Sequence, residues 1–485
     1  MGAMPEAYYR RPLLSGLELA SACGGVVIRG DPKTTVAGVS TDSRQVVPGD
    51  LFFALKGQNQ DGHKFLDAAW AAGAAGAVVS DLPPGDVPPG RLVIRVPDTV
   101  GALGRLAGYF RERFSPVVVG ITGSVGKTTT KDFTAAVLGR AGNVLANHGN
   151  LNTEVGLPLT VFRLRPEHAF AVFEMGMRGP GQISALCNIA RPQVGVITNI
   201  GTTHLELLGS IEAIANAKKE LILALPPYGR AVLWADDPWL WRFGHETGLP
   251  VVWFGFGEGR AAGAGGVYTR GAIAVHPDGT DFELAYRDFA VPVHLGVPGR
   301  HIVLDALAAA AVGFALGLDP ETIRAGLERA AVSGMRSEIL HTGSFVVIND
   351  AYNASPVSMR AALELLGLIG RGRRKVAVLG DMLELGEASR EAHREVGRLV
   401  YRLGVDVLVA VGPRSRDMVR ACHEEGMDPR RVFEFSDAAT AAEAVPSLLE
   451  PGDAILVKAS RGTHLELVVA ALQRAAGAGP GGSEP

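Results

Sequence analysis

Residues 117–131 read V-V-V-G-I-T-G-S-V-G-K-T-T-T-K. The apolar start predicts a strand buried on both faces, and helix-forming residues follow a loop that is broken by Gly123 and Gly126. A triphosphate needs inward-pointing N–H groups from a turn without Cβ atoms, a helix N-terminus behind it and a mobile cation. The two glycines supply the turn, Lys127 can reach the β- and γ-phosphates, and the hydroxyl of Thr128 can ligate magnesium. This stretch therefore predicts a strand, a phosphate loop and a helix.

The loop matches the pattern G-x-x-x-x-G-K-[ST] imperfectly, because the first glycine position falls on Ile121 and a glycine stands one residue earlier, at Gly120. The strand before the loop and the helix after it still favour nucleotide binding. The alternative interpretation is a glycine-rich turn between a strand and a helix, with a solvated lysine.

Length and composition narrow the class of protein. A chain of 485 residues is too long for one hydrophobic core, so two to four domains are expected. The net charge of -3, from 47 basic and 50 acidic residues, gives no indication of a nucleic-acid partner. Cys23, Cys187 and Cys422 lack metal-ligand spacing and favour buried thiols in a reducing compartment. Because no signal segment and no apolar run of membrane-spanning length is evident, we expect a cytoplasmic enzyme without membrane insertion.

The residues before the phosphate loop predict a small N-terminal α/β domain, residues 1–115, that ends at Ser115-Pro116. Ser15 and Glu18 have capping-box spacing at the start of an apolar helix. Further helices are expected at 63–72 and 99–114, and strands at 36–39, 51–55, 77–80 and 92–96. The polar loop Ser40-Thr41-Asp42-Ser43-Arg44 could hold an anionic ligand, although ordinary turn chemistry is the favoured interpretation from composition alone.

A central domain, residues 116–332, alternates strands and helices as a mostly parallel, P-loop ATPase-like sheet requires. Apolar strands are expected at 169–173 and 194–198, and Glu174 and His204 follow them. Ligands collect at the carboxyl ends of such strands, so both residues are candidate metal ligands. Each alone is more typical of a surface carboxylate or a structurally satisfied histidine. Residues 262–297, with the hairpin dipeptide Asp278-Gly279, predict an antiparallel flap before a helix at 301–316.

The third domain, residues 333–476, has the pattern of a doubly wound, Rossmann-like sheet without a second phosphate loop. Its strands are expected at 345–349, 375–379, 405–411, 432–435 and 454–458. The tail, residues 477–485, consists of Gly, Ala, Pro, Ser and Glu and is expected to be disordered.

Lys218 lies within a predicted helix over residues 210–225. Counting from Ile211, position 218 falls on the apolar stripe, whereas Lys219 does not. Burial lowers the pKa of an ammonium, and a neutral lysine amine is a nucleophile toward carbon dioxide. A lysine that snorkels to solvent or pairs with a carboxylate is the favoured alternative from periodicity alone.

Together these stretches resemble the Mur ligase family over nearly the whole chain. The family's phosphate loop has the form T-G-[ST]-x-G-K-T, found here at Thr122 to Thr128, which accounts for the shifted glycine. The asparagine-rich segment N-H-G-N-L-N-T-E-V-G at 147–156 and T-N-I-G-T-T-H-L-E at 198–206 are similar to family segments. Residues 349–353 and 379–386 and Lys458-Ala459-Ser460-Arg461 resemble the branch that adds D-alanyl-D-alanine, and the Asp-Asn-Pro-Arg string of the sibling that adds the third residue is absent.

The resemblance implies the cofactors ATP and Mg²⁺ and a set of site residues. Catalysis and metal binding are assigned to Lys127, Thr128, Glu174, His204 and Lys218, the last as a carbamate that would supply oxygen ligands to magnesium. Further nucleotide contacts are implied for Gly123, Ser124, Gly126, Thr129, His301, Arg336 and Asp350. Substrate contacts are implied for Ser40, Asp42, Ser43, Arg44, Asn150, Asn152, Thr153, Asn353, Lys458 and Ser460.

Two departures from the family pattern stand out. The family usually reads G-x-H-N-x-x-N before the alanine-rich helix, but this chain has Ile302 and Asp305 in place of the two asparagines. Ser355 likewise replaces the second asparagine of Tyr-Asn-Ala-Asn-Pro. Adenine and ribose contacts at the helix that begins near His301 are therefore left open.

The implied reaction begins when the terminal carboxylate of UDP-N-acetylmuramoyl-tripeptide takes the γ-phosphoryl group of ATP. The amine of D-alanyl-D-alanine then attacks the acyl phosphate. Such chemistry asks the protein mainly for positioning and charge neutralisation. The protein is expected to be a monomer. Two alternatives stay open: another amino-acid-adding member, such as the tripeptide-forming or folylpolyglutamate branch, and an ATP-switched binding module that makes no bond.

Overall fold

The computed structural model describes residues 14–57, 60–81, 86–332 and 334–477. Contacts within the chain divide it into two compact units. The first contains residues up to Thr122, Ala141–Val196 and Ala217–Ala231, and the second contains Gly123–Arg140, Ile197–Asn216 and Val232 onward. These divisions do not follow the domain boundaries expected at 116 and 333, which stay predictions.

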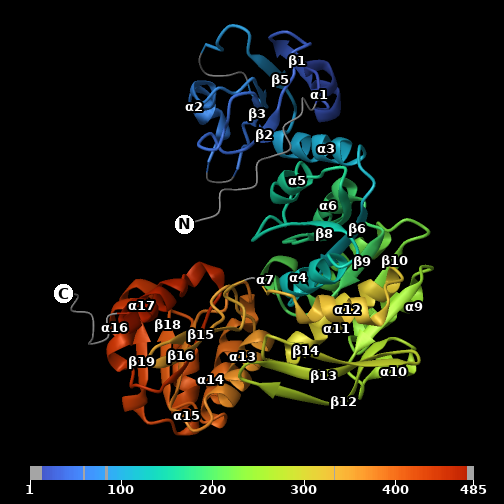
Figure 1. Ribbon diagram of the computed structural model, residues 1–485. Coiled ribbons are helices and arrows are strands. Elements are labelled where there is room, and N and C mark those ends of the chain that lie inside the picture. The colour runs from blue at the N-terminus through green and yellow to red at the C-terminus, as the bar shows by residue number, and fades with distance from the viewer. Residues whose placement is uncertain (1–13, 58–59, 82–85, 333, 478–485) are drawn as a thin grey trace, which may run out of the picture. The chain divides into compact units, whose positions relative to one another are not determined.

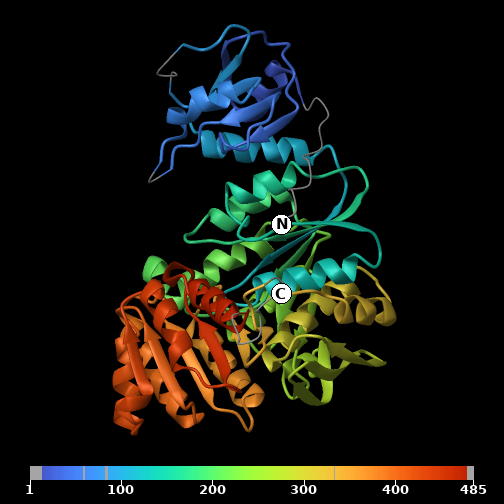
Figure 2. The same ribbon diagram turned by 60° about the vertical axis from the view of Figure 1, so that its left-hand side comes forward.

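The N-terminal region forms a five-stranded sheet in the order β1-β5-β4-β3-β2, blue in Figure 2. The strands are β1 (Val26–Arg29), β2 (Gly38–Ser40), β3 (Asp50–Phe53), β4 (Gly76–Val79) and β5 (Leu92–Arg95). The helices are α1 (Gly16–Cys23), η1 (Gly62–Phe65), α2 (Leu66–Ala71) and α3 (Thr99–Arg111). The capping box between Ser15 and Glu18 is confirmed. The antiparallel edge strand β1 was not predicted, because two of its four residues are exposed and the other two are only half-buried.

The central sheet has nine strands in the order β14-β13-β12-β11-β10-β9-β6-β8-β7. They are β6 (Val117–Thr122), β7 (Asn143–Ala146), β8 (His168–Glu174), β9 (Val194–Ile197), β10 (Arg230–Trp234), β11 (Val251–Gly255), β12 (Val267–His276), β13 (Gly279–Tyr286) and β14 (Phe289–Leu295). Strands β6, β8 and β7 pair in parallel. The predicted hairpin at Asp278-Gly279 joins β12 to β13, and β12, β13 and β14 form the expected antiparallel flap.

The helices of this region begin with α4 after the phosphate loop and end with α12. They are α4 (Lys127–Leu138), α5 (Gly156–Val161), α6 (Gln182–Ala190), α7 (Leu205–Leu208), α8 (Ile211–Leu223), α9 (Pro238–Glu246), α10 (Arg260–Gly263), α11 (Arg300–Ala315) and α12 (Pro320–Glu328). The alanine-rich helix α11 is buried along most of its length, and it packs against α4. Small side chains let these two helices approach closely, which places α11 next to the phosphate loop.

The C-terminal sheet has six strands in the order β15-β16-β20-β17-β18-β19. They are β15 (Glu338–Thr342), β16 (Phe345–Asn349), β17 (Lys375–Gly380), β18 (Val407–Val411), β19 (Val432–Phe435) and β20 (Ala454–Lys458). The sheet is parallel except at the edge strand β15, which was not predicted. Successive residues of β17 point to opposite faces, so Ala377 and Leu379 belong to one core and Val376 and Val378 to another.

Helices cover both faces of this sheet, as Figure 1 shows, and confirm the doubly wound pattern. They are α13 (Pro356–Ile369), η2 (Gly386–Ala388), α14 (Ser389–Arg402), α15 (Arg416–Glu425), η3 (Pro429–Arg431), α16 (Ala438–Leu448), η4 (Arg461–Thr463) and α17 (Glu466–Gly477). Residues 478–485 of the predicted disordered tail lie outside the described residues.

The described residues include three cysteines, none of which forms a disulfide. Cys23, Cys187 and Cys422 are free and buried, as expected, and burial raises the pKa of each thiol to about 12. Among the described residues, no helix combines the length and apolar character needed to cross a membrane.

Candidate active site

The phosphate loop joins β6 to α4, and both of its glycines are required by its shape. Gly123 has φ +150° and Gly126 has φ +85°, a region that side chains with a Cβ rarely adopt. A Cβ at Gly123 would lie 1.9 Å from Thr198 Oγ1, and one at Gly126 would lie 2.1 Å from Asp305 Oδ1. Gly126 is also the N-cap of α4, and a glycine offers no side-chain acceptor to the first N–H groups of the helix. An anion can take that place.

Residues at the end of β9 hold the loop in shape. Asn199 accepts the Ser124 N–H on its backbone oxygen at 3.1 Å and the Val125 N–H on Oδ1 at 3.0 Å. Its Nδ2 and Thr198 Oγ1 both donate to the Val125 carbonyl, at 2.9 and 2.6 Å. Ser124 Oγ accepts the Gly201 N–H at 2.8 Å. The sequence placed Asn199 after a strand but gave it no role, and its position at the carboxyl end of a buried strand was the available signal.

Lys127 and Thr128 occupy the start of α4, where the sequence placed them. The Lys127 ammonium donates to the Gly123 and Ser124 carbonyls, at 2.8 and 3.3 Å, so it lies over the loop. The buried Thr128 hydroxyl accepts a hydrogen bond of 3.0 Å from Arg336 Nη2. Arg336 also stacks on the ring of Tyr352, 3.7 Å from its centroid. Arg336, whose nucleotide contact was implied only by resemblance, therefore lies beside the phosphate loop.

Asp305 lies under the loop. It is buried on α11, and Thr130 Oγ1 donates to its Oδ1 at 3.3 Å. Burial raises the pKa of Asp305 well above its ordinary value, because desolvation disfavours the carboxylate. On the same helix, desolvation lowers the pKa of His301 to about 4, and Ser337 Oγ lies 3.4 Å from its Nε2. Asp305 stands where the family pattern has an asparagine, and its contact with the loop arises from the packing of α11.

Glu174 ends β8 and is 4% exposed. It pairs in the sheet with Ile121, two residues before Gly123. Asn152 Nδ2 donates to Glu174 Oε1 at 2.7 Å, which orients the carboxylate. Asn147, also buried, accepts the Glu174 N–H at 2.9 Å. The asparagine-rich segment therefore holds Glu174 in place through Asn147 and Asn152. The predicted substrate residues Asn150 and Thr153 of the same segment are exposed.

Lys218 is 2% exposed, which confirms its predicted inward orientation, and Lys219 is half-buried. Glu174 and Lys218 belong to the first unit, whereas Thr128 and His204 belong to the second. Hydroxyl and carboxylate oxygens are the donors that Mg²⁺ prefers, so Thr128 and Glu174 suit that ion. Among the described residues, no group of three or more His, Cys, Asp or Glu side chains is gathered as a metal site. The shared magnesium site therefore stays a prediction.

Four of the predicted C-terminal residues meet at the ends of β16 and β20. Lys458 is 2% exposed, and its ammonium donates to Asp350 Oδ2 at 2.6 Å and to the Asn353 carbonyl at 2.9 Å. Ser460 Oγ accepts the Leu383 N–H at 2.9 Å. The parallel pairing of β16 with β20 explains the meeting, because it brings the carboxyl ends of both strands to one edge.

The predicted N-terminal substrate loop follows β2 and satisfies its own polar groups. Ser40 Oγ donates to the Asp42 carbonyl at 2.9 Å. Arg44 donates to both carboxylate oxygens of Asp42, through Nη2 at 2.7 Å and Nε at 3.0 Å, and this pairing lowers the pKa of Asp42. Ser43 is half-buried between them. These bonds are ordinary turn chemistry, so contact with an anionic substrate stays a prediction.

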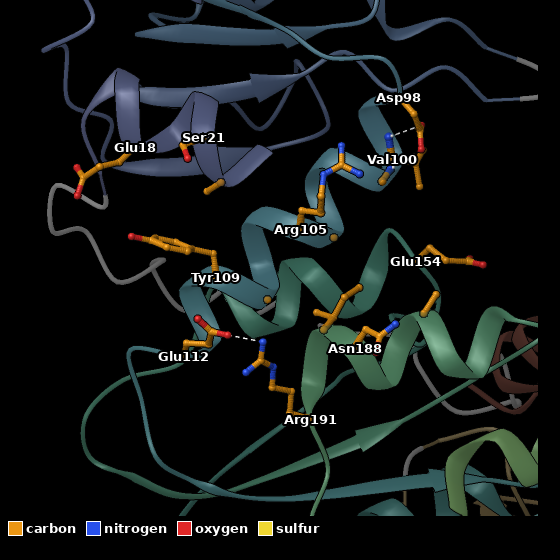
Figure 3. A pocket seen from close by; sticks show the side chains of 16 residues that line it. Glu18, Ser21, Asp98, Val100, Arg105, Tyr109, Glu112, Glu154, Asn188 and Arg191 are labelled. Carbon is orange, nitrogen blue, oxygen red and sulfur yellow. Dashed lines mark hydrogen bonds and ion pairs between the residues drawn. The ribbon is translucent and has the colours of Figure 1, made fainter. Parts of the chain in front are cut away.

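A separate cavity of about 780 Å³ lies between α1, α3 and α6, as Figure 3 shows. Arg105 lines it and donates to the Cys23 carbonyl through Nε and Nη2, at 2.9 and 2.8 Å. Glu112 and Arg191 form an ion pair at its edge. None of the predicted site residues lines this cavity.

Three family models match the chain in sequence order. They are the Mur ligase family catalytic domain over residues 35–111, the Mur ligase middle domain over 121–313 and the Mur ligase glutamate ligase domain over 335–461. These matches correspond to a three-domain α/β architecture.

Curated relatives and solved structures extend the similarity across the chain. The UDP-N-acetylmuramoyl-tripeptide--D-alanyl-D-alanine ligase of Bacillus subtilis is 37% identical, covering 90% of this chain and 93% of the relative. The enzyme of the same name from Escherichia coli is also 37% identical, covering 90% of this chain and 94% of the relative. The structure of MurF from Acinetobacter baumannii matches with a TM-score of 0.84 and 32% identity, over 96% of this chain and all of that one. MurF ligase from Thermotoga maritima in complex with ADP matches with a TM-score of 0.78 and 30% identity, over 90% of this chain and 97% of that one.

Proposed function

Because the chain belongs to the Mur ligase family, we propose that it joins D-alanyl-D-alanine to UDP-N-acetylmuramoyl-tripeptide with cleavage of ATP. The observation that carries this proposal is the extent of the similarity, which includes the C-terminal region where branches of the family differ. The phosphate loop supports it, because both of its glycines are sterically required and it is followed by a lysine and a hydroxyl. The protein is thus an ATP-dependent ligase that forms a peptide bond.

The reaction proceeds in two transfers. First, an oxygen of the terminal tripeptide carboxylate forms a bond to the γ-phosphorus of ATP, and the bond to the β,γ-bridging oxygen breaks to release ADP. Second, the dipeptide amine attacks the carbonyl carbon of the acyl phosphate, loses a proton and expels phosphate. Both transfers need fixed geometry and charge neutralisation more than they need a covalent enzyme nucleophile.

The residues of the phosphate loop supply the charge neutralisation. The N–H groups at the start of α4 and the Lys127 ammonium neutralise the phosphate oxygens, and Arg336 adds a second cation beside Thr128. Mg²⁺ would be held by Thr128 and Glu174, and at a second position by His204 and carbamylated Lys218, and it would neutralise charge that develops on the phosphates. Gly123, Ser124, Gly126 and Thr129 line the loop, while His301 and Asp350 serve the nucleoside side.

The outer domains hold the two other substrates. Residues 1–115 bind the UDP end of the tripeptide, with Ser40, Asp42, Ser43 and Arg44 as contacts, and Asn150, Asn152 and Thr153 reach its peptide end. Residues 333–476 bind D-alanyl-D-alanine through Asn353, Lys458 and Ser460. The enzyme acts as a cytoplasmic monomer, and closure of its domains excludes water from the acyl phosphate.

The test is phosphate release with each substrate omitted in turn. A ligase releases phosphate from ATP only when both the tripeptide and the dipeptide are present. Steady ATP hydrolysis without either would favour a nucleotide-switched binding module and contradict the proposal. Lys127→Ala serves as the matched control, since it removes the loop cation without changing either peptide site.

A further inference from the structure

We propose that Glu384 is a positioning residue that holds His204 in the tautomer required for metal binding. This inference deepens the proposed function, on which it rests for the assignment of His204 to a metal ion. Glu384 lies in the segment that follows β17, and His204 precedes α7. Nothing in the sequence pattern or in the family matches pairs these two residues, which are separated by 180 positions.

The geometry of the pair assigns the proton on the ring. His204 Nδ1 and Glu384 Oε2 are 2.5 Å apart, and the two side chains are 19% and 36% exposed. An ionised carboxylate only accepts hydrogen bonds, so Nδ1 must carry the hydrogen. In the neutral ring Nε2 then holds the lone pair, which is the form that ligates a metal. A ring that lacked this acceptor could place its hydrogen on Nε2 and lose that capacity.

The backbone supplies an independent observation. His204 has φ +66° and Glu384 has φ +62°, so both members of the pair adopt the left-handed conformation that non-glycine residues rarely use. Such strain persists where the surroundings fix it, and it is common at functional sites. Here the Glu206 N–H donates to the Glu384 carbonyl at 3.3 Å. A Cβ built at Gly386 would lie 3.3 Å from Glu206 Cα, so the two segments are in close backbone contact.

The same contact could instead be a simple ion pair that fastens the two segments together. A fastening ion pair depends on the negative charge of residue 384, whereas tautomer selection depends on a hydrogen-bond acceptor at its oxygen. Glu384→Gln separates the two roles, because glutamine keeps an acceptor oxygen and loses the charge. Glu384→Ala removes both. Glu387, which is exposed on the next turn of the same segment, provides the control Glu387→Ala.

The first measurement is the protonation pattern of the His204 ring in the full-length protein labelled with ¹⁵N-histidine. The spectrum of His204→Gln identifies the signal. We expect the hydrogen on Nδ1 in the wild type, Glu384→Gln and Glu387→Ala, and a shift toward the Nε2–H form in Glu384→Ala. This readout needs neither nucleotide nor peptide substrate, so it stands apart from any failure of the ligase assignment. A wild-type ring that carries its hydrogen on Nε2 would overturn the proposal.

The second measurement is Mn²⁺ binding in the presence of ADP, followed by electron paramagnetic resonance. The site of interest is the binding that His204→Gln abolishes. Loss of a partner behind a metal-binding histidine weakens affinity about 10- to 100-fold, which is the effect expected for Glu384→Ala. Glu384→Gln should stay within about threefold of the wild type, and Glu387→Ala should match it. If Glu384→Gln is as weak as Glu384→Ala, or if neither variant differs from the wild type, the positioning role is wrong.

Discussion

Replacement of Gly126 by alanine tests whether the phosphate loop is the nucleotide site. Alanine at φ +85° pays about 1–2 kcal/mol for the left-handed conformation. Its Cβ would also lie 2.1 Å from Asp305 Oδ1, closer than any real contact, and overpacking of this kind costs about 1–3 kcal/mol. The two effects together amount to about 2–5 kcal/mol. If this cost applies to the loop conformation that binds nucleotide and not to the free protein, the Kd for ADP rises by a factor of roughly thirty to several thousand.

Titration calorimetry with ADP measures the change, and Gly181→Ala is its matched control. Gly181 is the N-cap of α6 with φ +81°, but no described atom lies within 4 Å of the Cβ built there. The control therefore pays the conformational cost alone, away from the phosphate loop, and should keep the wild-type Kd. Adding Asp305→Ala to Gly126→Ala removes the clash and should restore part of the affinity. Wild-type affinity in Gly126→Ala would refute the assignment of this loop to the nucleotide.

Four further outcomes are expected. Lys127→Ala should lower product formation by about 10³-fold or more at an unchanged melting temperature, since it removes a cation from the transferred phosphoryl group. Lys218→Ala should lose most activity and regain part of it with added acetate; full activity without acetate would exclude a carbamate. Asp305→Asn should raise the free energy of unfolding at pH 8 by about 1–3 kcal/mol. The pKa of the buried Asp305 carboxyl is raised, so the folded protein loses stability as pH rises and this carboxyl ionises, and the neutral asparagine avoids that loss. The pKa of His301 is lowered from 6.5 to about 4, so the unfolded chain binds more protons between these values and stability should fall as pH decreases from 6.5 to 4. Chemical denaturation across that range should show that the wild type loses less than about 3 kcal/mol of stability, because His301 is only half-buried. This loss should be absent in His301→Gln.

The parts of the fold that the sequence predicted are those with a strong local signal. Strand β6, which leads into the phosphate loop, and strands such as β17 and β20 are nearly continuous apolar runs between turn residues, and they are buried along nearly all their length. The edge strands β1 and β15 were missed because each is short, half-exposed and antiparallel to its neighbour. A half-buried run beside a turn lacks a distinctive hydrophobic period.

In the candidate site, too, the residues with a local sequence signal were predicted and those brought in by packing were missed. Gly126 and Lys127 were identified because the loop that they build is encoded in adjacent residues. The Asn199 and Asp305 contacts with the loop were not predictable, since tertiary packing brings them from 74 and 175 positions away. The Glu384 contact with His204 has the same origin, and only the packed chain reveals it.

Product analysis by mass spectrometry tests the central claim most directly. The purified protein is incubated with ATP, Mg²⁺, UDP-N-acetylmuramoyl-tripeptide and one acceptor at a time: D-alanyl-D-alanine, L-alanyl-L-alanine, or a single amino acid. We predict a product only with D-alanyl-D-alanine, with a mass equal to the tripeptide plus the dipeptide minus one water, and with ADP and phosphate formed in equal amounts. A product formed instead with a single amino acid, or no product with any acceptor while ATP is hydrolysed, would contradict the assigned ligase activity.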